Sequence, residues 1–441
     1  MHTPVIDKES AGRANEAAIP VESPSSWRLL NLLLRFRAFE SLRYREYRLI
    51  WYGQIFASMG QWMDEVTRGW LMYELTNSAV QLGLVIGIQA IPILFLSPLA
   101  GSTADRYSRK AQVVAAQIVN GLIFAATALL IYTGLIRPWH LYVTAFLMAT
   151  AQTFLQPART ALVADVIPPS CLTNAIGLNS IIFNLSRSTG PALAGVLISA
   201  FGTGNAYSIQ AAFFFLSTFW TLQLSQAHCA AAGNGGRPTP GETLVQSIIE
   251  GWKFSWQNEA VRAGLLTVSV VFFFIVPFRA ILPVFARDLL GVGATGQGLL
   301  LTAMGIGAMF SSLLIMSGGD RLPRGKLMLG SVMLYGVVLV LFAASPWFHL
   351  SLAVMLLAGS CNSLSHALAQ TVVQSYSPPE FHGRTMAIFN MTHVVMTAGS
   401  ILIGALSSLV GARIALASMA SAGTLAIVLV YAAMSRARHI R

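Results

Sequence analysis

The stretch Gly101 to Lys110 reads G-S-T-A-D-R-Y-S-R-K and interrupts a long apolar run with a cluster of charges. A related stretch, Gly319 to Lys326, reads G-D-R-L-P-R-G-K and again interrupts apolar sequence. Each stretch places an Asp-Arg pair a few residues before further basic side chains. A charged stretch that recurs between apolar segments indicates a chain built from two related halves.

The composition excludes a water-soluble globular protein. Of the 441 residues, 55% are hydrophobic and only 10% are charged, and the mean hydropathy is +0.64. So little polar surface is not enough to cover a soluble fold of this length. We therefore expect an all-α integral membrane protein with lipid as the solvent of most of the chain.

Twelve apolar segments are long enough to cross a bilayer. A hydrocarbon core about 30 Å thick requires about 20 apolar residues per helix. Most connections between the segments are short, which makes consecutive helices antiparallel neighbours. The predicted transmembrane helices are 47–73, 79–100, 111–133, 140–163, 174–200, 206–226, 261–286, 296–317, 327–345, 350–374, 385–408 and 411–433.

One longer connection divides these helices into two sets of six. It contains a Gly-rich run followed by an amphipathic piece at 244–256. Upstream of the first helix, 27–45 alternates apolar residues with Arg, which fits an amphipathic helix on the inner leaflet or a simple basic flank. The predicted organisation is a cytoplasmic tail over 1–45, a six-helix bundle over 46–226, a cytoplasmic linker over 227–260, a second bundle over 261–433 and a tail over 434–441.

The two predicted bundles are related in sequence. Pro168-Pro169 and Pro378-Pro379 end corresponding helices, and the offset between them is close to the offset between the two Asp-Arg pairs. Repeats that run in the same direction, each with an even number of spans, imply a pseudo-twofold axis along the membrane normal. A central cavity between the bundles follows.

The basic residues are distributed unevenly across the predicted membrane. The net charge is +11, and 21 of the 28 Lys and Arg residues lie on one side of the twelve helices. Cytoplasmic loops carry this excess, so both termini are expected in the cytoplasm. The charge therefore reflects topology and anionic lipid rather than nucleic acid. The exceptions are Arg137, Arg287 and Arg413 on the other side, and Arg68, Arg159, Arg187 and Arg279 within helices.

The sequence carries no catalytic or cofactor-binding pattern. The three cysteines have neither disulfide nor metal-ligand spacing, and there is no phosphate-binding glycine-rich loop with Lys. We expect no enzymatic activity, no cofactor and no metal site. Transport driven by ATP is unsupported, so any pumping must use an ion gradient.

Polar side chains recur at steps of three and four along one face of the predicted helix 47–73. An ion near mid-membrane costs roughly 2.5 to 3.5 kcal/mol on insertion scales, so this face must meet protein or water. Asp64 and Arg68 are four residues apart and can pair. The ions either form a structural pair or handle protons and substrate; a second acid without a partner on this helix favours the latter. The polar residues are Gln54, Ser58, Gln61, Glu65 and Arg68, with Asp64 on the edge.

Other predicted helices add polar residues to the same cavity. The repeat offset places Arg279 opposite Glu65, and three cationic side chains would favour substrates with negative or hydrogen-bond-accepting groups. His366 alone fits a buried, hydrogen-bonded histidine better than a proton site. Nearby aromatic residues either stack on aromatic substrate parts or face lipid; these are Trp62, Trp70, Phe183 and Phe274. The cavity residues are Gln152, Gln156, Arg159, Asn184, Arg187, Arg279, Asn362, His366, Gln370, Asn390 and His393.

These motifs resemble those of a known transporter superfamily. The Asp-Arg stretches resemble the cytoplasmic signature loops of the major facilitator superfamily. Gly190, Pro191 and Gly195 resemble the motif in the fifth helix of exporters of this superfamily, with Ala194 in place of a glycine. By physics alone, these residues indicate a bent, tightly packed helix. The run from Gly60 to Ala79 is similar to the branch of enterobactin exporters and macrolide-efflux proteins.

The resemblance implies a secondary active transporter. It would export a siderophore or drug-like small molecule by alternating access, as a proton-coupled antiporter that works as a monomer in the plasma membrane. Two alternatives stay open: a membrane sensor or scaffold that keeps the fold without transport, and a lipid flippase.

Coupling and gating can be assigned to particular residues. Glu65 is predicted to take and release the proton while Arg68 holds Asp64 ionised, although adjacent acids can titrate as a coupled pair. An alternative proton route would use His366 and His393.

Asp105 is predicted to face Arg384 and the N-terminus of the predicted helix 385–408. This contact would be a latch between the two halves. Arg109 would brace it through Asp165, and a weaker mate would join Asp320 to Asn174. Charges that only set topology are the alternative. The gating set is Gly101, Asp105, Arg106, Arg109, Asp165, Asp320, Arg321 and Arg384.

Overall fold

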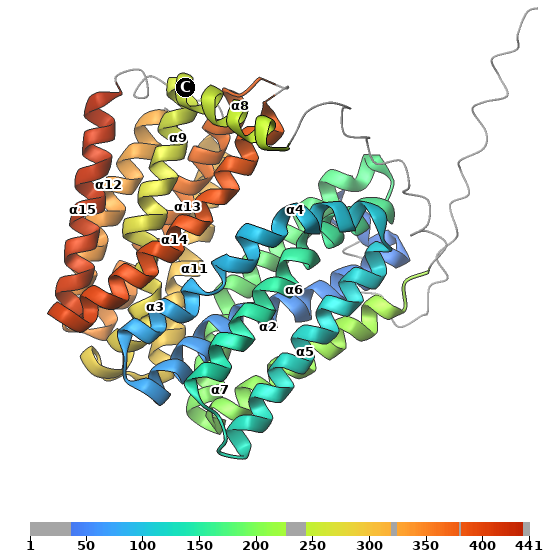
Figure 1. The fold of residues 1–441 in the computed structure, drawn as a ribbon, viewed down its shortest axis with the longest axis horizontal. Coiled ribbons are helices and arrows are strands. Elements are labelled where there is room, and N and C mark those ends of the chain that lie inside the picture. Colours follow the sequence, from blue (N-terminus) through green and yellow to red (C-terminus); the bar gives the residue numbers. More distant parts are fainter. Residues whose placement is uncertain (1–36, 226–243, 319–323, 379–380, 435–441) are drawn as a thin grey trace, which may run out of the picture.

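A computed structural model describes residues 37–225, 244–318, 324–378 and 381–434 (Figure 1). Every regular element in these ranges is helical, and short turns join most of them. In chain order the elements are η1 (Arg37–Arg43), α2 (Arg45–Thr76), α3 (Ala79–Gly87), α4 (Ala90–Arg106), α5 (Arg109–Tyr132), α6 (Pro138–Asp165), η2 (Pro169–Cys171), α7 (Leu172–Leu222), α8 (Leu244–Gln257), α9 (Glu259–Val270), η3 (Val271–Ile275), η4 (Val276–Ile281), α10 (Leu282–Val284), η5 (Phe285–Leu289), α11 (Gly293–Gly318), α12 (Arg324–Ala344), α13 (Phe348–Ser375), α14 (His382–Val410) and α15 (Ala412–Ala433).

The predicted twelve-helix fold is confirmed, although helices and elements do not correspond one to one. α7 contains two predicted helices, because Gly202 leaves the helical conformation with φ 83° and ψ 165°. Only glycine adopts such a backbone readily. Conversely, the predicted helix 79–100 is divided into α3 and α4, and the predicted helix 261–286 extends from α9 to η5.

Hydropathy alone identifies most of these spans. Among the described residues, nine helical stretches are long and apolar enough to cross a membrane, and one of them, Pro169–Leu222, holds the two helices separated at Gly202. α2 and α6 are missing from this set because polar and charged side chains interrupt them. Their polar faces are therefore exceptions in an otherwise lipid-compatible chain.

Figure 1 shows two groups of helices side by side, one from α2 to α7 and one from α9 to α15. We call them the first and second bundle. α8 lies beside α14 at one end of the second bundle. Residues 226–243 lie outside the described ranges, so the predicted domain bounds remain a prediction. Of the predicted amphipathic segment 27–45, the structure describes η1 and the residues that follow it.

The two bundles meet closely at one end, which we call the contact end; it carries the turns at 76–79, 289–293 and 410–412. There α7 packs against α11, and α3 packs against α14. A Cβ on Gly298 would stand 2.3 Å from the carbonyl oxygen of Pro191, and one on Gly83 would stand 2.3 Å from that of Ser400. Glycine at these positions lets the backbones approach closely.

The opposite end carries the turns at 106–109 and 257–259 together with α8, and we call it the linker end. In Figure 1 the two bundles diverge from the contact end towards the linker end. Among the described residues, the close packing between the bundles is at the contact end.

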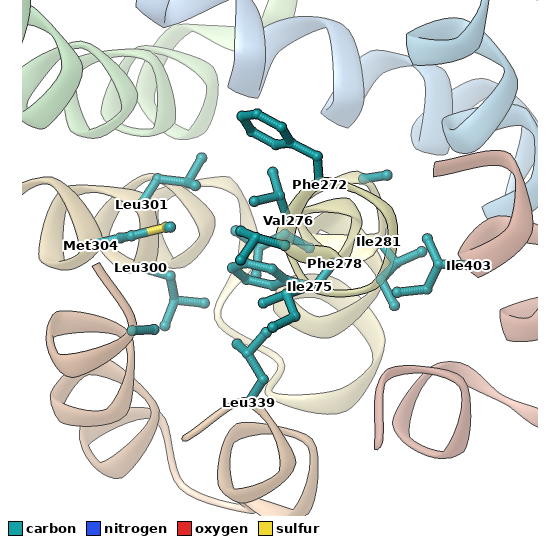
Figure 2. Close-up of a cluster of buried hydrophobic side chains, with 14 of the residues drawn as sticks. Phe272, Ile275, Val276, Phe278, Ile281, Leu300, Leu301, Met304, Leu339 and Ile403 are labelled. Carbon is teal, nitrogen blue, oxygen red and sulfur yellow. The ribbon is translucent and has the colours of Figure 1, made fainter. Parts of the chain in front are cut away.

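The core of the second bundle surrounds an irregular helix. Figure 2 shows side chains of η3 and η4 packed among α11, α12 and α14. η3 is a π-helix and η4 a 3₁₀-helix, and Pro277 in η4 has no backbone N–H to donate. Phe278 and Ala280 are buried. Their burial anchors Arg279, which lies between them in the chain.

Candidate functional site

The first predicted ion pair forms within the first bundle. Arg68 Nη2 lies 2.8 Å from Asp64 Oδ2, and Arg68 Nε donates to the same oxygen at 2.9 Å. Arg68 is 5% exposed and also donates to the carbonyl of Leu141 and the hydroxyl of Thr144 on α6. The pair therefore ties α2 to α6 at the contact end.

The second acid of α2 reaches the other bundle. Arg279 Nη2 in η4 lies 2.7 Å from both carboxylate oxygens of Glu65. The Arg279 and Glu65 side chains keep 22% and 28% of their area exposed. An acid that lacks a partner on its own helix thus has a cationic partner across the interface between the bundles.

Aromatic and cationic side chains surround this inter-bundle pair. The Arg187 guanidinium on α7 stands 6.0 Å from the centre of the Trp62 ring, and that ring lies 5.3 Å from the Phe183 ring. Arg187 is also within electrostatic range of Glu65, Arg279 and the buried Tyr335 of α12. We call this group the central cluster; it comprises Trp62, Glu65, Phe183, Arg187, Arg279 and Tyr335.

Tyr335 was missed by sequence reasoning. It lies in the run Leu334-Tyr335-Gly336 within an apolar segment, where a tyrosine also fits a lipid or interface position. Its only sequence signal is a large polar side chain in the predicted helix 327–345, whose other polar side chains are serines.

The remaining predicted cavity residues of the first bundle differ in their hydrogen-bond partners and in their exposure. Gln54 donates to Ser58 on its own helix, and Asn184 donates to the carbonyl of Ser180. Gln156 is exposed, and Gln61 and Gln152 are half-buried. Arg159 is 9% exposed, and the described residues provide it with no carboxylate within ion-pair distance. The structure thus does not bring all predicted residues into one cluster.

In the second bundle, His366 on α13 packs edge-on against Phe272 and Phe389, at 5.9 Å and 5.3 Å between ring centres. It lines a small pocket with residues of α9 and η3. Asn362 is half-buried and Asn390 is exposed. The side chain of His393 lies outside the described part. His366 therefore lies in an aromatic setting, and its proton-handling role stays a prediction.

The predicted brace at the linker end is present. Arg109 Nη1 lies 2.5 Å from Asp165 Oδ1, joining the start of α5 to the end of α6. Arg106 is exposed. The surroundings of Gly101, the side chain of Asp105, and all of Asp320 and Arg321 lie outside the described part of the chain, so the latches predicted through them remain predictions.

Arg384 has a carboxylate partner on α8 within its own half of the molecule. Its Nη1 lies 2.6 Å from Glu250 Oε2 on α8, and its guanidinium stands 5.4 Å from the centre of the Phe381 ring. Asn174, the predicted mate of Asp320, accepts a hydrogen bond from the backbone N–H of Ser41 at 3.0 Å.

A second polar contact joins the bundles at the contact end. The Tyr73 hydroxyl on α2 donates to the Asp288 carboxylate on η5. Arg287 Nη1 donates to Asn77 Oδ1 at 2.9 Å, and its guanidinium stands 5.4 Å from the centre of the Tyr73 ring. Sequence reasoning missed this contact because its partners come from distant helix ends.

The helix-5 motif is packed on two sides. A Cβ on Gly190 would stand 2.8 Å from Trp62 Cβ in the same bundle, and one on Gly195 would stand 2.5 Å from the carbonyl oxygen of Ala294 in the other. The chain stays helical through Pro191. The tight packing expected of the motif is thus present at both glycines.

The grouping of potential metal ligands can be stated for the described part of the chain. Across residues 37–225, 244–318, 324–378 and 381–434, no three His, Cys, Asp or Glu side chains are grouped closely enough to hold a metal ion. The polar chemistry of the central cluster comes from ion pairing and hydrogen bonding.

The two helical bundles have the arrangement of the major facilitator fold. The chain belongs to the Transmembrane secretion effector family, which matches residues 37–440. It is thus a multi-pass membrane protein of a transporter family.

Relatives of the chain have transporter names. It is 23% identical to the staphyloferrin A transporter of Staphylococcus aureus, over 80% of this chain and 87% of that one. It is 24% identical to the multidrug efflux pump Tap of Mycolicibacterium fortuitum, over 82% and 89%.

Solved structures share the fold at low sequence identity. A bacterial homologue of the human lysosomal transporter Spinster, in an inward-facing and unoccupied conformation, aligns with a TM-score of 0.68 at 14% identity. The alignment covers 90% of this chain and 97% of that one.

Proposed function

We propose that this protein exports a siderophore or a drug-like small molecule in exchange for protons, by alternating access. The observation that carries the proposal is the Glu65–Arg279 pair, which joins the bundles at 2.7 Å and stays partly exposed. The names of the siderophore and multidrug relatives support the substrate class. A plasma-membrane location and action as a monomer belong to the same proposal.

The proposed orientation places both termini and the linker end in the cytoplasm. The excess of Lys and Arg on that side supports it. With this orientation the described conformation is closed outside, where the glycines of α7, α11, α3 and α14 pack, and diverges inside. It would be the state that receives cargo from the cytoplasm.

Glu65 would couple the export of cargo to the entry of a proton. Protonation removes the charge of the carboxylate and with it the pair to Arg279 that holds the two bundles together. A cargo group that engages the ionised carboxylate would lose that interaction when Glu65 is protonated. Cargo and proton would then compete for one group, which is sufficient for exchange. Asp64, held by Arg68, would stay ionised and structural.

The test is a Glu65→Gln variant reconstituted in vesicles beside the wild type. Gln keeps the size and a weaker hydrogen bond to Arg279 but binds no proton, so concentrative, pH-driven efflux of a dye should be abolished. Downhill movement of the same dye should remain. A protonophore should reduce wild-type efflux to the level of the variant.

Three outcomes would contradict the proposal. Pumping by Glu65→Gln against a gradient, with normal pH dependence, would move the proton to another site. Wild-type vesicles that move no dye would favour a sensor or scaffold. Movement of labelled lipid instead of dye would favour a flippase.

A further inference from the structure

The central cluster holds more hydrogen-bond donors than the described structure provides acceptors for. Trp62 Nε1, Arg279 Nε and the Tyr335 hydroxyl are buried, and none has a hydrogen-bond partner among the described residues. Buried polar groups are nearly always paired, so each such group calls for a specific explanation. Three of them around one ion pair indicate that an acceptor from outside the chain belongs here.

The charge balance of the cluster points the same way. Arg187 and Arg279 bring two guanidinium groups, while Glu65 brings one carboxylate. Arg279 takes both oxygens of that carboxylate. The contact described for Arg187 is the Trp62 ring at 6.0 Å. One positive charge in excess therefore lies beside donors that have no partner among the described residues.

The geometry also supplies an apolar platform. The Trp62 and Phe183 rings are in edge-to-face contact at 5.3 Å, and Phe183 is 40% exposed. A flat apolar body resting on these rings would hold a substituent close to Arg187 and Trp62 Nε1. Stacking and a charge-assisted hydrogen bond could then act on one molecule.

We propose that the central cluster binds the oxyanion of its cargo, a carboxylate or a comparable oxygen-rich anionic group, carried on an aromatic or similarly flat apolar body. Arg187 is the main partner of the oxyanion, and Trp62 Nε1 and the Tyr335 hydroxyl donate further hydrogen bonds. The inference rests on the proposed transport function and narrows its substrate class. The same cargo can meet Glu65 through a hydroxyl or amine donor, so the oxyanion subsite and the competition at Glu65 involve different parts of one molecule.

Two probes that share a ring test this preference. Salicylate and salicylamide differ in carrying a carboxylate or a neutral amide beside the same hydroxyl. Their binding to the purified full-length protein is measured by equilibrium dialysis at one ionic strength. We expect the wild type to bind salicylate about tenfold more tightly than the amide, which is a modest gain for a charge-assisted pair.

Four variants assign the preference to the cluster. Arg187→Gln should reduce the ratio of the two affinities to near one, while Arg187→Lys, which keeps the charge, should retain part of it. Trp62→Phe keeps an aromatic ring but removes the unpartnered Nε1, so it should lower the affinity for salicylate and leave that for salicylamide unchanged. Arg413→Gln is the matched control. It removes an equal charge outside the central cluster, where the described contact of Arg413 is a hydrogen bond to the Ala344 carbonyl.

Equal wild-type affinities for the two probes would overturn the proposal, as would an unchanged ratio in folded Arg187→Gln. If Arg187→Gln does not fold, Trp62→Phe decides the question in the same way. The readout is binding, so a protein that prefers salicylate but shows no proton-driven efflux would contradict the proposed function and leave this inference standing.

Discussion

At the scale of single residues, two adjacent carboxylates on α2 meet different surroundings. Successive residues of an α-helix point about 100° apart, because a turn contains 3.6 residues. Asp64 therefore turns towards Arg68 and α6 inside its own bundle, whereas Glu65 turns towards Arg279 in the other. The first acid stabilises a bundle, and the second lies where the bundles must separate.

Asp64→Asn is expected to reduce folding rather than coupling. The change leaves Arg68, 5% exposed, without its carboxylate, and breaking such a buried pair costs about 3–5 kcal/mol. The folded yield in membranes and the Tm of the purified protein should both fall. Glu250→Gln is a suitable control, since Glu250 is 54% exposed and its pair with Arg384 contributes at most about 1 kcal/mol. Equal yields for the two variants would show that the Asp64 pair is not structural.

The sequence predicts some of these partners better than others. The Asp64–Arg68 pair follows from a spacing of four on one helix, and the facing of Glu65 and Arg279 follows from the repeat. Nothing in the sequence joins Tyr73 to Asp288, because neither the spacing nor the repeat relates two helix ends in different bundles. Tyr335 was missed because a tyrosine among Leu, Gly and Val also fits a lipid-facing position.

At the scale of elements, the contact end depends on backbones that lie very close together. α7 and α11 approach at Gly298 and Gly195, and α3 and α14 approach at Gly83 and Gly404. In a bilayer, association between helices relies on van der Waals packing, since lipid is as apolar as the side chains. Small residues therefore control how firmly this end is closed.

Gly298→Ala is expected to loosen the contact end. The added Cβ would stand 2.3 Å from the Pro191 carbonyl oxygen, so the two helices must separate. Overpacking of this kind costs about 1–3 kcal/mol, which should lower the Tm and weaken the closed contact end. Gly177→Ala on α7 is the matched control, because a Cβ there meets no atom within 4 Å. A Tm for Gly298→Ala no lower than that of the control would contradict this role of the interface.

The segments 261–286 and 174–200 show what periodicity and hydropathy leave out. The first appears in the sequence as one uniform apolar helix, yet Pro277 and Pro283 lie in a chain of π, 3₁₀ and short α pieces. The sequence shows where the prolines are. It does not show which hydrogen-bond pattern replaces that of the α-helix around them. In the second, the bend expected at Pro191 stays a prediction, and the residue of α7 that leaves the helical conformation is Gly202, just beyond this segment.

At the scale of the whole molecule, polar contacts between the bundles are concentrated at and near the contact end. Glu65–Arg279, Tyr73–Asp288 and Arg287–Asn77 all join α2 to the helix that ends at Leu289. At the linker end, Arg109–Asp165 braces the first bundle, and Arg384–Glu250 ties α8 to the second. An alternating-access cycle must release the first group and create contacts at the linker end.

Arg384 is the residue we expect to act in the latch at the linker end. In the described conformation it pairs with Glu250 at 2.6 Å, beside the start of α14. Asp105 lies near the end of α4, at the same end of the molecule but in the other bundle. When the linker end is closed, we expect Asp105 to pair with Arg384 in competition with Glu250, and the N-terminus of α14 would add its partial positive charge.

Asp105→Asn should therefore depress transport while leaving membrane insertion intact. A partly exposed ion pair contributes up to about 1 kcal/mol, which changes the balance of the two conformations about fivefold. Glu250→Gln is the opposing variant: it removes the partner of Arg384 in the described state and should favour closure of the linker end. Transport rates in vesicles, normalised to inserted protein, measure both effects. Full transport by Asp105→Asn would exclude the latch. The charges between Gly101 and Lys110 would then serve only to set the membrane topology.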